Sequence, residues 1–154
     1  MPAASADNKT EGMGEGMNSE GYEYLNAVRN IDLKILRLGA KKKMLESCLY
    51  PSGIRYDLDK VQGSRENQME RLVGEISEID RKIDDLNAEK IKKAADIENS
   101  IDKLDNDETK TVLSFRFIAD MRVNDIAEVR GYSPDWVYKR IREGVDEVGK
   151  MLKT

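Results

Sequence analysis

Hydrophobic residues recur at steps of three and four along most of this chain, the spacing that places side chains on one face of a helix. A first hydrophobic stripe is formed by Leu25, Val28, Ile31, Ile35, Leu38, Leu45 and Leu49. Position 42 falls on the same stripe but is occupied by Lys42. The stripe predicts a helix over 22–49, about 42 Å long at the helical rise. Leu33 and Leu36 lie off this stripe and could either widen it or serve a second contact.

A second stripe begins after a segment at about 50–67 that contains Pro51, Gly53 and Gly63 and is predicted to be a loop. Its first members step by four and three, as in a heptad seam: Leu72, Ile76, Ile79, Ile83 and Leu86. Lys90 and Lys93 then fall on the seam, and the stripe resumes with Ile97, Ile101 and Leu104. Folded back on each other, the two helices form a long antiparallel helical hairpin, or coiled coil, over 21–105. A parallel dimer through the second helix remains open, because the same heptads serve a partner in the same chain or in another copy.

Residues 106–154 carry a shorter pattern of helix, short helix, turn and helix. The short helix covers 123–130 and Gly131 suits the sharp turn after a helix end. Ser133 is a good N-cap for a last helix that opens with Pro134, and the inward stripe of this helix is Val137, Ile141, Val145, Val148 and Leu152. This is the layout of a helix-turn-helix with the last helix as the recognition helix, although other three-helix bundles share it.

Composition supports an all-α chain and argues against an enzyme. Of the 154 residues, 36% are charged and 6% aromatic, which favours helices with solvated faces over a β-rich fold. There is no histidine, and Cys48 is the only cysteine. Without the commonest general base and metal ligand, we expect no catalytic site, no metal and no cofactor. We expect Cys48 to be a buried, small apolar residue near the end of the hairpin.

The ends of the chain and its apolar runs bear on localisation. Residues 1–20 are rich in Gly, Ser, Asn and Glu without apolar periodicity, and they predict a disordered tail. No apolar run approaches the roughly 20 residues needed to span a bilayer, and the single cysteine suits a reducing compartment. The expectation is a cytoplasmic protein without membrane contact.

The charge is distributed unevenly, although the net charge is only −4. Residues 22–50 carry six basic and three acidic groups, whereas 51–105 carry ten and fourteen. A basic helix followed by an acidic one suggests that the two helices of the hairpin attract each other. Residues 106–154 are neutral overall, with nine groups of each sign, so any DNA-binding surface there must be local.

The C-terminal residues resemble a known family. The stretch from Leu113 to Val145, LSFRFIADMRVNDIAEVRGYSPDWVYKRIREGV, resembles region 4 of bacterial sigma factors. It is still more similar to the sigma-like helix-turn-helix proteins of phages and prophages of Gram-positive bacteria, related to the RinA and ArpU late-gene regulators. The matching positions are Leu113, Arg116, Phe117, Ile118, Ile126, Ala127, Gly131, Tyr132, Ser133, Trp136, Val137 and Tyr138. The resemblance implies a sigma-region-4-like DNA-binding domain in the bacterial host cell, and it extends loosely over 22–152.

The chain departs from that family at positions that bear on affinity. Arg122 stands where relatives usually place a Ser or Thr N-cap, and Arg130 and Arg140 occupy positions that are commonly apolar. Pro134-Asp135 replaces the polar or basic pair that often opens the recognition helix, and an Asp there would repel phosphates yet could accept from a cytosine amino group.

The candidate DNA-binding residues follow from the face opposite the inward stripe. Lys139 and Arg142, one turn apart, are the best candidates for base or phosphate contacts in a major groove. The full candidate set is Ser133, Asp135, Trp136, Lys139, Arg140, Arg142, Arg122 and Arg130. A tryptophan such as Trp136 is more often a core or hinge anchor than a base-stacking group, and the basic cluster could be an ordinary solvated face.

Three functions remain open from the sequence. The first is a phage-encoded, sigma-like regulator that binds double-stranded DNA at promoters, with RNA polymerase as a second partner and a homodimer through the hairpin left open. The second is a DNA-packaging protein like a terminase small subunit, which also combines a helix-turn-helix with oligomerising helices. The third is a protein-binding module without DNA contact.

Overall fold

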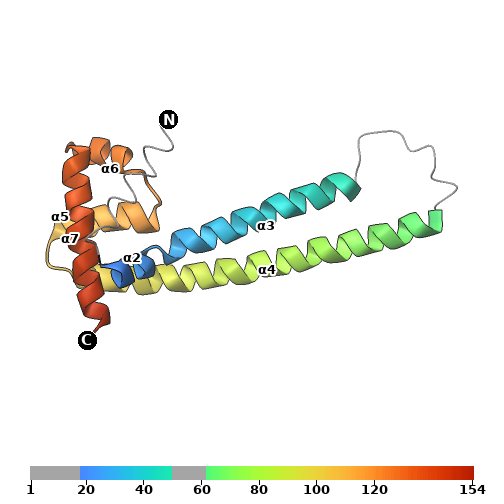
Figure 1. Ribbon diagram of the computed structural model, residues 1–154, viewed down its shortest axis with the longest axis horizontal. Coiled ribbons are helices and arrows are strands. Elements are labelled where there is room, and N and C mark those ends of the chain that lie inside the picture. The colour runs from blue at the N-terminus through green and yellow to red at the C-terminus, as the bar shows by residue number, and fades with distance from the viewer. Residues whose placement is uncertain (1–17, 50–61) are drawn as a thin grey trace. The chain divides into compact units, whose positions relative to one another are not determined.

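A computed structural model of the chain describes residues 18–49 and 62–154, and its regular elements there are all helical (Figure 1). In chain order the elements are α2 (Ser19–Leu25), α3 (Ala27–Leu49), α4 (Gln62–Asp102), α5 (Asp107–Leu113), the π-helical turn η1 (Ser114–Ile118), α6 (Val123–Arg130) and α7 (Pro134–Leu152). The all-α class is confirmed. The predicted tail at 1–17 and the centre of the predicted loop at 50–61 lie outside the described residues.

Three boundaries differ from the sequence prediction. The first helix begins at Ser19, because Asn18 caps it by accepting a hydrogen bond from the Gly21 N–H at 2.9 Å. It breaks at Asn26, where neither Gly nor Pro announces a break, and continues as α3. α4 begins at Gln62 and not after residue 67, since a helix of 41 residues tolerates an early glycine at a cost of about 1 kcal/mol.

The chain forms two compact units, and neither coincides with a division at residue 105. One comprises residues 31–89, the larger part of the hairpin. The other comprises residues 1–30 and 90–154, so that α2, the first turn of α3 and the last turns of α4 belong with α5–α7. The hydrophobic pattern identifies which face each helix buries, but not which element covers it.

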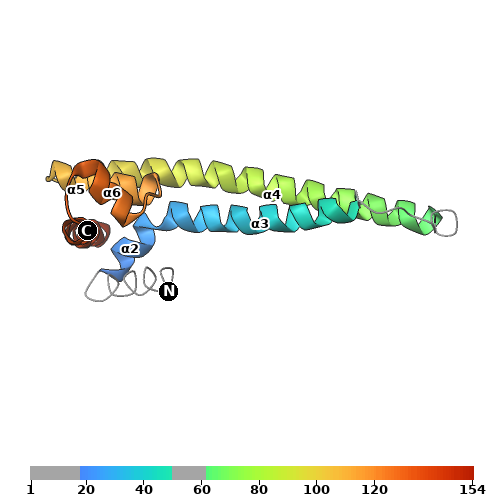
Figure 2. The ribbon, with the colours of Figure 1, turned by 90° about the horizontal axis from the view of Figure 1, so that it is seen from above.

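In the unit formed by residues 31–89, α3 and α4 run side by side and antiparallel (Figures 1 and 2). Ile31, Leu45, Leu49 and Ile79 are buried along the seam. Lys42, the one charged residue on the first hydrophobic stripe, places its Nζ 2.7 Å from Asp80 Oδ1 across the seam. The hydrogen bond with Asp80 raises the pKa of Lys42. Cys48 is exposed and not buried as expected, since it lies on the side of α3 away from the seam.

The other unit has a continuous hydrophobic core, to which α7 contributes Val137, Ile141, Val145 and Val148, all buried as predicted. The last turns of α4 contribute Ile97 and Ile101, and Leu104 follows just beyond the helix. α5, η1 and α6 contribute Val112, Leu113, Phe117, Val123, Ile126 and Ala127. Leu152 is exposed and not inward as predicted, because it lies in the final turn of α7. Burial of this core supplies most of the stability that holds α7 in place.

Helix α2 is fixed closely against α7. A Cβ atom on Gly21 would collide with the Val145 carbonyl oxygen, so only glycine permits this approach. The Asn18 N–H donates to Asp146 Oδ1 at 3.0 Å. One turn further along α2, the Tyr24 hydroxyl donates to the Asp96 carbonyl oxygen of α4 at 3.0 Å. α2 therefore ties the C-terminal half of α7 to the end of α4.

Candidate nucleic-acid interface

Helix α6, a short turn and helix α7 follow one another in the order that the sequence predicts. Gly131 ends α6 in the left-handed region, at φ 74°, which disfavours a side chain there. The Tyr132 N–H then donates to the Ala127 carbonyl oxygen at 3.0 Å, closing the helix end. Ser133 Oγ accepts from the Trp136 N–H at 3.2 Å, and Pro134 follows as the first residue of α7. The capping residues expected from the sequence are thus all present.

The turn before α6 depends on a buried arginine. The backbone reverses at Asp120, whose φ of 56° is uncommon for a residue with a side chain. The Arg116 side chain, buried in the described structure, donates from Nη1 to the Met121 carbonyl oxygen at 3.0 Å. Burial lowers the pKa of Arg116, and the positive charge of Arg29 lowers it further. Arg29 itself places its Nε 3.4 Å from Asp120 Oδ1. This cluster sets the start of α6.

The outward face of α7 carries the two residues that the sequence singles out for DNA contact. Lys139 and Arg142 are exposed, while Val137 and Ile141 on the opposite face are fully buried. Neither Lys139 nor Arg142 has an ion-pair partner among the described residues. Asp135 and Ser133 are exposed at the start of the same helix. These side chains are available to a ligand that approaches the N-terminal half of α7.

Arg122 is exposed as well and precedes α6 without a side-chain cap. The absence of an N-cap side chain at Arg122 is what the sequence predicts. A cap of this kind stabilises a helix by about 1 kcal/mol, and here α6 forms without it because Val123, Ile126 and Ala127 are buried in the core.

Two of the candidate arginines are held by carboxylates of the same chain. Arg130 Nη2 is ion-paired with Glu108 Oε1, and both side chains are two-thirds buried. Arg140 Nη1 lies 3.6 Å from Glu143 Oε2, and its guanidinium carbon lies 5.3 Å from the centre of the Trp136 ring. These side chains support the fold around α7, and each would have to give up its partner to reach a phosphate.

Trp136 is half-buried and stacks on Tyr132, with ring centroids 3.9 Å apart. It therefore serves as an anchor between the turn and α7, one of the two readings that the sequence leaves open. Tyr132 and Val129 are exposed beside it, at 46% and 63%. They extend an apolar patch along the end of α6 and the turn.

Lys150 and Glu108 are not among the residues that the sequence pattern singles out. Lys150 is exposed three turns beyond Lys139 on α7, and helical spacing alone could have identified it. Glu108 lies 22 residues before Arg130, and no local pattern signals that the two side chains meet.

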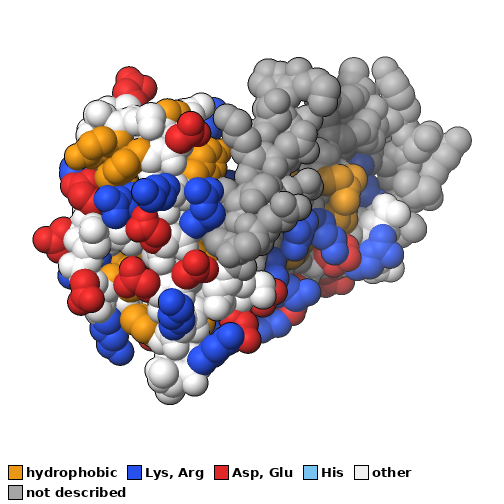
Figure 3. All heavy atoms as spheres, turned by 60° about the vertical axis from the view of Figure 1, so that its left-hand side comes forward, with side chains coloured by type: hydrophobic (Ala, Val, Ile, Leu, Met, Phe, Trp, Pro, Cys, Tyr) orange, Lys and Arg blue, Asp and Glu red, His pale blue; other side chains and the backbone are white. Residues whose placement is uncertain are grey.

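The surface over the C-terminal helices carries both signs of charge. Figure 3 shows blue basic and red acidic side chains interspersed on this face rather than segregated. Along α7, the exposed residues include Lys139, Arg142 and Lys150 on one hand and Asp135 and Glu147 on the other. Such a surface favours a ligand whose anionic groups contact a few of these basic side chains in a defined arrangement. It disfavours indiscriminate binding of polyanions.

The described part of the chain contains no grouping of three or more Cys, Asp or Glu side chains suited to a metal ion. Within the same residues, no helix combines the length and apolarity required to cross a lipid bilayer.

Comparison with known proteins gives one match. The model of the family described as "Protein of unknown function (DUF1492)" matches residues 51–149, which include α4, α5, η1 and α6 and all but the last residues of α7. No curated protein and no solved structure matches the chain. Because the match covers well over half of the sequence, the chain belongs to the DUF1492 family.

Proposed function

We propose that the protein is a phage-encoded, sigma-region-4-like transcriptional regulator that binds promoter DNA through α6 and α7 and acts with the RNA polymerase of the bacterial host. The observation that carries the proposal is the exposure of Lys139 and Arg142 on a helix whose start is capped and whose opposite face is buried. A recognition helix needs both features, because it must be held rigidly while its outer side chains enter the major groove.

Each exposed residue has a chemical role in this proposal. Arg142 donates two parallel hydrogen bonds to a guanine, a contact that discriminates by about 1–3 kcal/mol. Lys139, one turn earlier, binds a phosphate or a second guanine, and Arg122 binds a flanking phosphate. Asp135 accepts a hydrogen bond from the amino group of a cytosine and repels phosphates, which contributes to sequence selectivity.

The small number of free cations predicts modest affinity for a single copy. Each phosphate that is neutralised contributes to affinity through counterion release, so a few contacts give weak, salt-sensitive binding. A second copy of the chain or RNA polymerase on the same promoter supplies the remaining affinity by avidity.

Genome-wide occupancy of the tagged protein in its host tests the proposal. We expect discrete peaks at promoters, which disappear for the Lys139→Ala/Arg142→Ala variant and persist for the control Lys103→Ala. Lys103 is exposed just beyond α4, and its replacement removes a positive charge outside α7. Peaks confined to a single site at which DNA packaging begins, together with an assembly of many copies, would favour the terminase-like alternative.

A second candidate function is protein binding without DNA contact. The exposed Val129 and Tyr132 favour it, because apolar side chains beside the turn suit a protein surface better than a phosphate backbone. In that case the tagged protein retains polymerase or another partner after nuclease treatment, and no DNA fragment is enriched.

A further inference from the structure

Helix α3 is apolar on two opposite sides. One side forms the seam of the hairpin with Ile31, Leu45 and Leu49, which are buried. On the other side, Leu33, Leu36 and Met44 are 47%, 70% and 52% exposed. At 100° per residue, these three and the exposed Ala40 fall within an arc of about 80° centred opposite the seam. A large apolar stripe of this kind on a surface helix marks a contact site.

Basic side chains border this stripe on both edges. Lys34, Arg37 and Lys41 follow one edge and Lys43 the other, and all four are exposed. None of the four has an ion-pair partner among the described residues, in contrast to Lys42, which is bound to Asp80. We call this surface the α3 outer face: Leu33, Leu36, Ala40 and Met44 with Lys34, Arg37, Lys41 and Lys43.

The charges exclude the simplest self-pairing. If two copies packed α3 against α3, the borders of both stripes would bring basic residues together in either the parallel or the antiparallel orientation. Like charges across a helical interface are destabilising. The surface that covers the α3 outer face must therefore combine acidic residues with small or apolar ones.

The opposite side of the hairpin has this chemistry. On the side of α4 away from its seam, Val73 is 49% exposed and lies in line with the exposed small residues Ser77 and Ala88. The exposed acidic residues Glu66, Glu70 and Asp84 share this side, and none has an ion-pair partner among the described residues. We call these six residues the α4 outer face.

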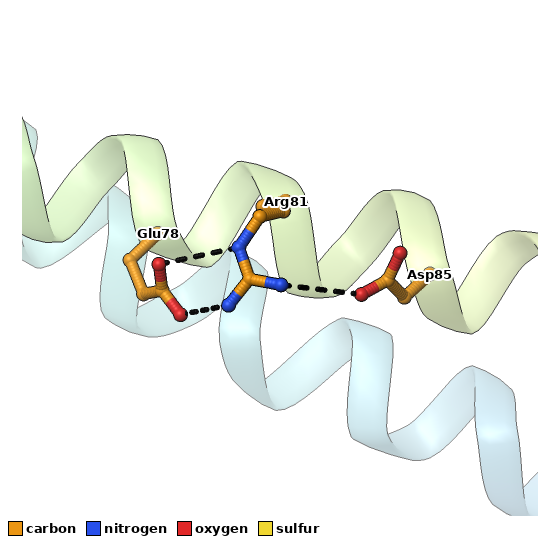
Figure 4. A network of polar contacts seen from close by, with 3 residues as sticks. All are labelled: Glu78, Arg81 and Asp85. Atoms are coloured by element: carbon orange, nitrogen blue, oxygen red, sulfur yellow. Dashed lines mark hydrogen bonds and ion pairs between the residues drawn. The ribbon is translucent and has the colours of Figure 1, made fainter.

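One basic residue, Arg81, lies on the α4 outer face between Ser77 and Asp84, and its charge is already compensated. Arg81 donates from Nε to Glu78 Oε2 at 3.3 Å and places Nη1 3.5 Å from Asp85 Oδ2 (Figure 4). Both carboxylates belong to the same helix, one turn before and one turn after Arg81. The α4 outer face therefore remains acidic.

We propose that the chain associates head to tail with a second copy of itself, the α3 outer face of one copy packing on the α4 outer face of the next. The leucines and Met44 lie against small residues, and the basic borders meet Glu66, Glu70 and Asp84. The two faces lie on opposite sides of the hairpin. When two copies are in contact, the α4 outer face of one copy and the α3 outer face of the other therefore remain free. Such a heterologous contact builds a ring or an open array and not a closed dimer. The proposal does not depend on DNA binding.

Sedimentation velocity of the full-length protein tests the proposal over about a hundredfold range of concentration. We expect the wild type to form species larger than a dimer as the concentration rises, and we expect high salt to reverse this. Leu36→Gln removes the most exposed of the large apolar side chains of the α3 outer face without disturbing the seam, and it should weaken association about tenfold. A wild type that remains monomeric, or a Leu36→Gln variant that associates normally, would overturn the proposal.

A charge exchange identifies the two faces. Variant one carries Arg37→Glu and Lys41→Glu, and variant two carries Glu70→Lys and Asp84→Lys. Each variant alone should remain monomeric, and an equimolar mixture should recover the wild-type assembly, because each reversed face then meets its complement. The control variant Lys92→Glu/Lys103→Glu reverses two exposed charges elsewhere and should assemble normally.

The other outcomes are also informative. If variant two alone assembles like the wild type, the α4 outer face takes no part in association and the proposal is wrong. If the mixture of variants one and two remains monomeric while circular dichroism shows both variants folded, the α4 outer face is not the partner. In that case the α3 outer face serves another acidic ligand.

Discussion

The ring of Tyr132 stacks on the ring of Trp136, with centroids 3.9 Å apart and planes inclined by 20°. Tyr132 belongs to the turn and Trp136 to the first turn of α7, so the stack braces the turn against the helix. The guanidinium of Arg140 lies on the same indole, 5.3 Å from its centre. The start of the proposed recognition helix is thus held by aromatic packing as well as by the Ser133 cap.

Replacing Trp136 by alanine should destabilise the C-terminal unit. The half-buried indole contributes buried apolar area and a stacking interaction of about 0.5–1.5 kcal/mol, so we expect a total loss of about 2 kcal/mol. Urea unfolding followed by circular dichroism measures the change. Trp136→Phe retains a ring and should recover about half of the loss, and an unchanged midpoint for Trp136→Ala would contradict the role of the stack.

Glycines at two helical positions should respond to alanine in opposite directions. Gly21→Ala forces a methyl group against the backbone of α7, and overpacking of this kind costs about 1–3 kcal/mol. Gly39→Ala on α3 meets nothing within 4 Å and should gain up to about 1 kcal/mol from helix propensity. Thermal unfolding of the two variants compares them directly. Stabilisation by Gly21→Ala would mean that α2 does not approach α7 closely.

Arg130 should affect stability more than DNA binding. Removing Glu108 by Glu108→Gln leaves a partly buried arginine without its carboxylate, and we expect a loss of about 1–2 kcal/mol. Arg130→Ala should cost a similar amount in urea unfolding while changing DNA affinity less than Lys139→Ala does. A large loss of affinity with unchanged stability would instead assign Arg130 to the interface.

The salt dependence of DNA binding should report individual phosphate contacts. If Arg122 binds a phosphate, Arg122→Ala should lower the slope of log K against log salt by about 1 and weaken all DNA sequences alike. If Arg142 reads a guanine, Arg142→Ala should relax the sequence preference by about 1–3 kcal/mol at one position. Titrations at several salt concentrations separate these effects, and identical behaviour of the two variants would contradict the assigned roles.

The sequence predicts the helices and their buried faces well, because periodicity is a local property. The stripe of α7 from Val137 to Val148 is buried as expected, and Ser133 and Gly131 cap the helices that they were expected to cap. The break at Asn26 was missed, since it arises from the packing of α2 on α7 and not from a helix-breaking residue.

Partners distant in sequence could not be predicted in the same way. The α4 stripe from Ile97 to Leu104 reads as a continuation of the hairpin seam, yet these residues join the core formed with α5–α7. Arg130 is predicted as a free cation until Glu108, 22 residues earlier, is seen beside it, whereas helical spacing alone could have indicated the Arg140–Glu143 pair. Only the three-dimensional contacts distinguish the free cations Lys139 and Arg142 from these paired ones.

The central claim is that the outward face of α7 binds DNA through Lys139 and Arg142. Fluorescence anisotropy with a promoter fragment from the most occupied genomic site, at low salt, tests it most directly. The account predicts saturable binding that Lys139→Ala/Arg142→Ala weakens by about a hundredfold or more, while Lys103→Ala binds like the wild type. Equal binding by all three proteins, or no binding by any of them, would contradict it.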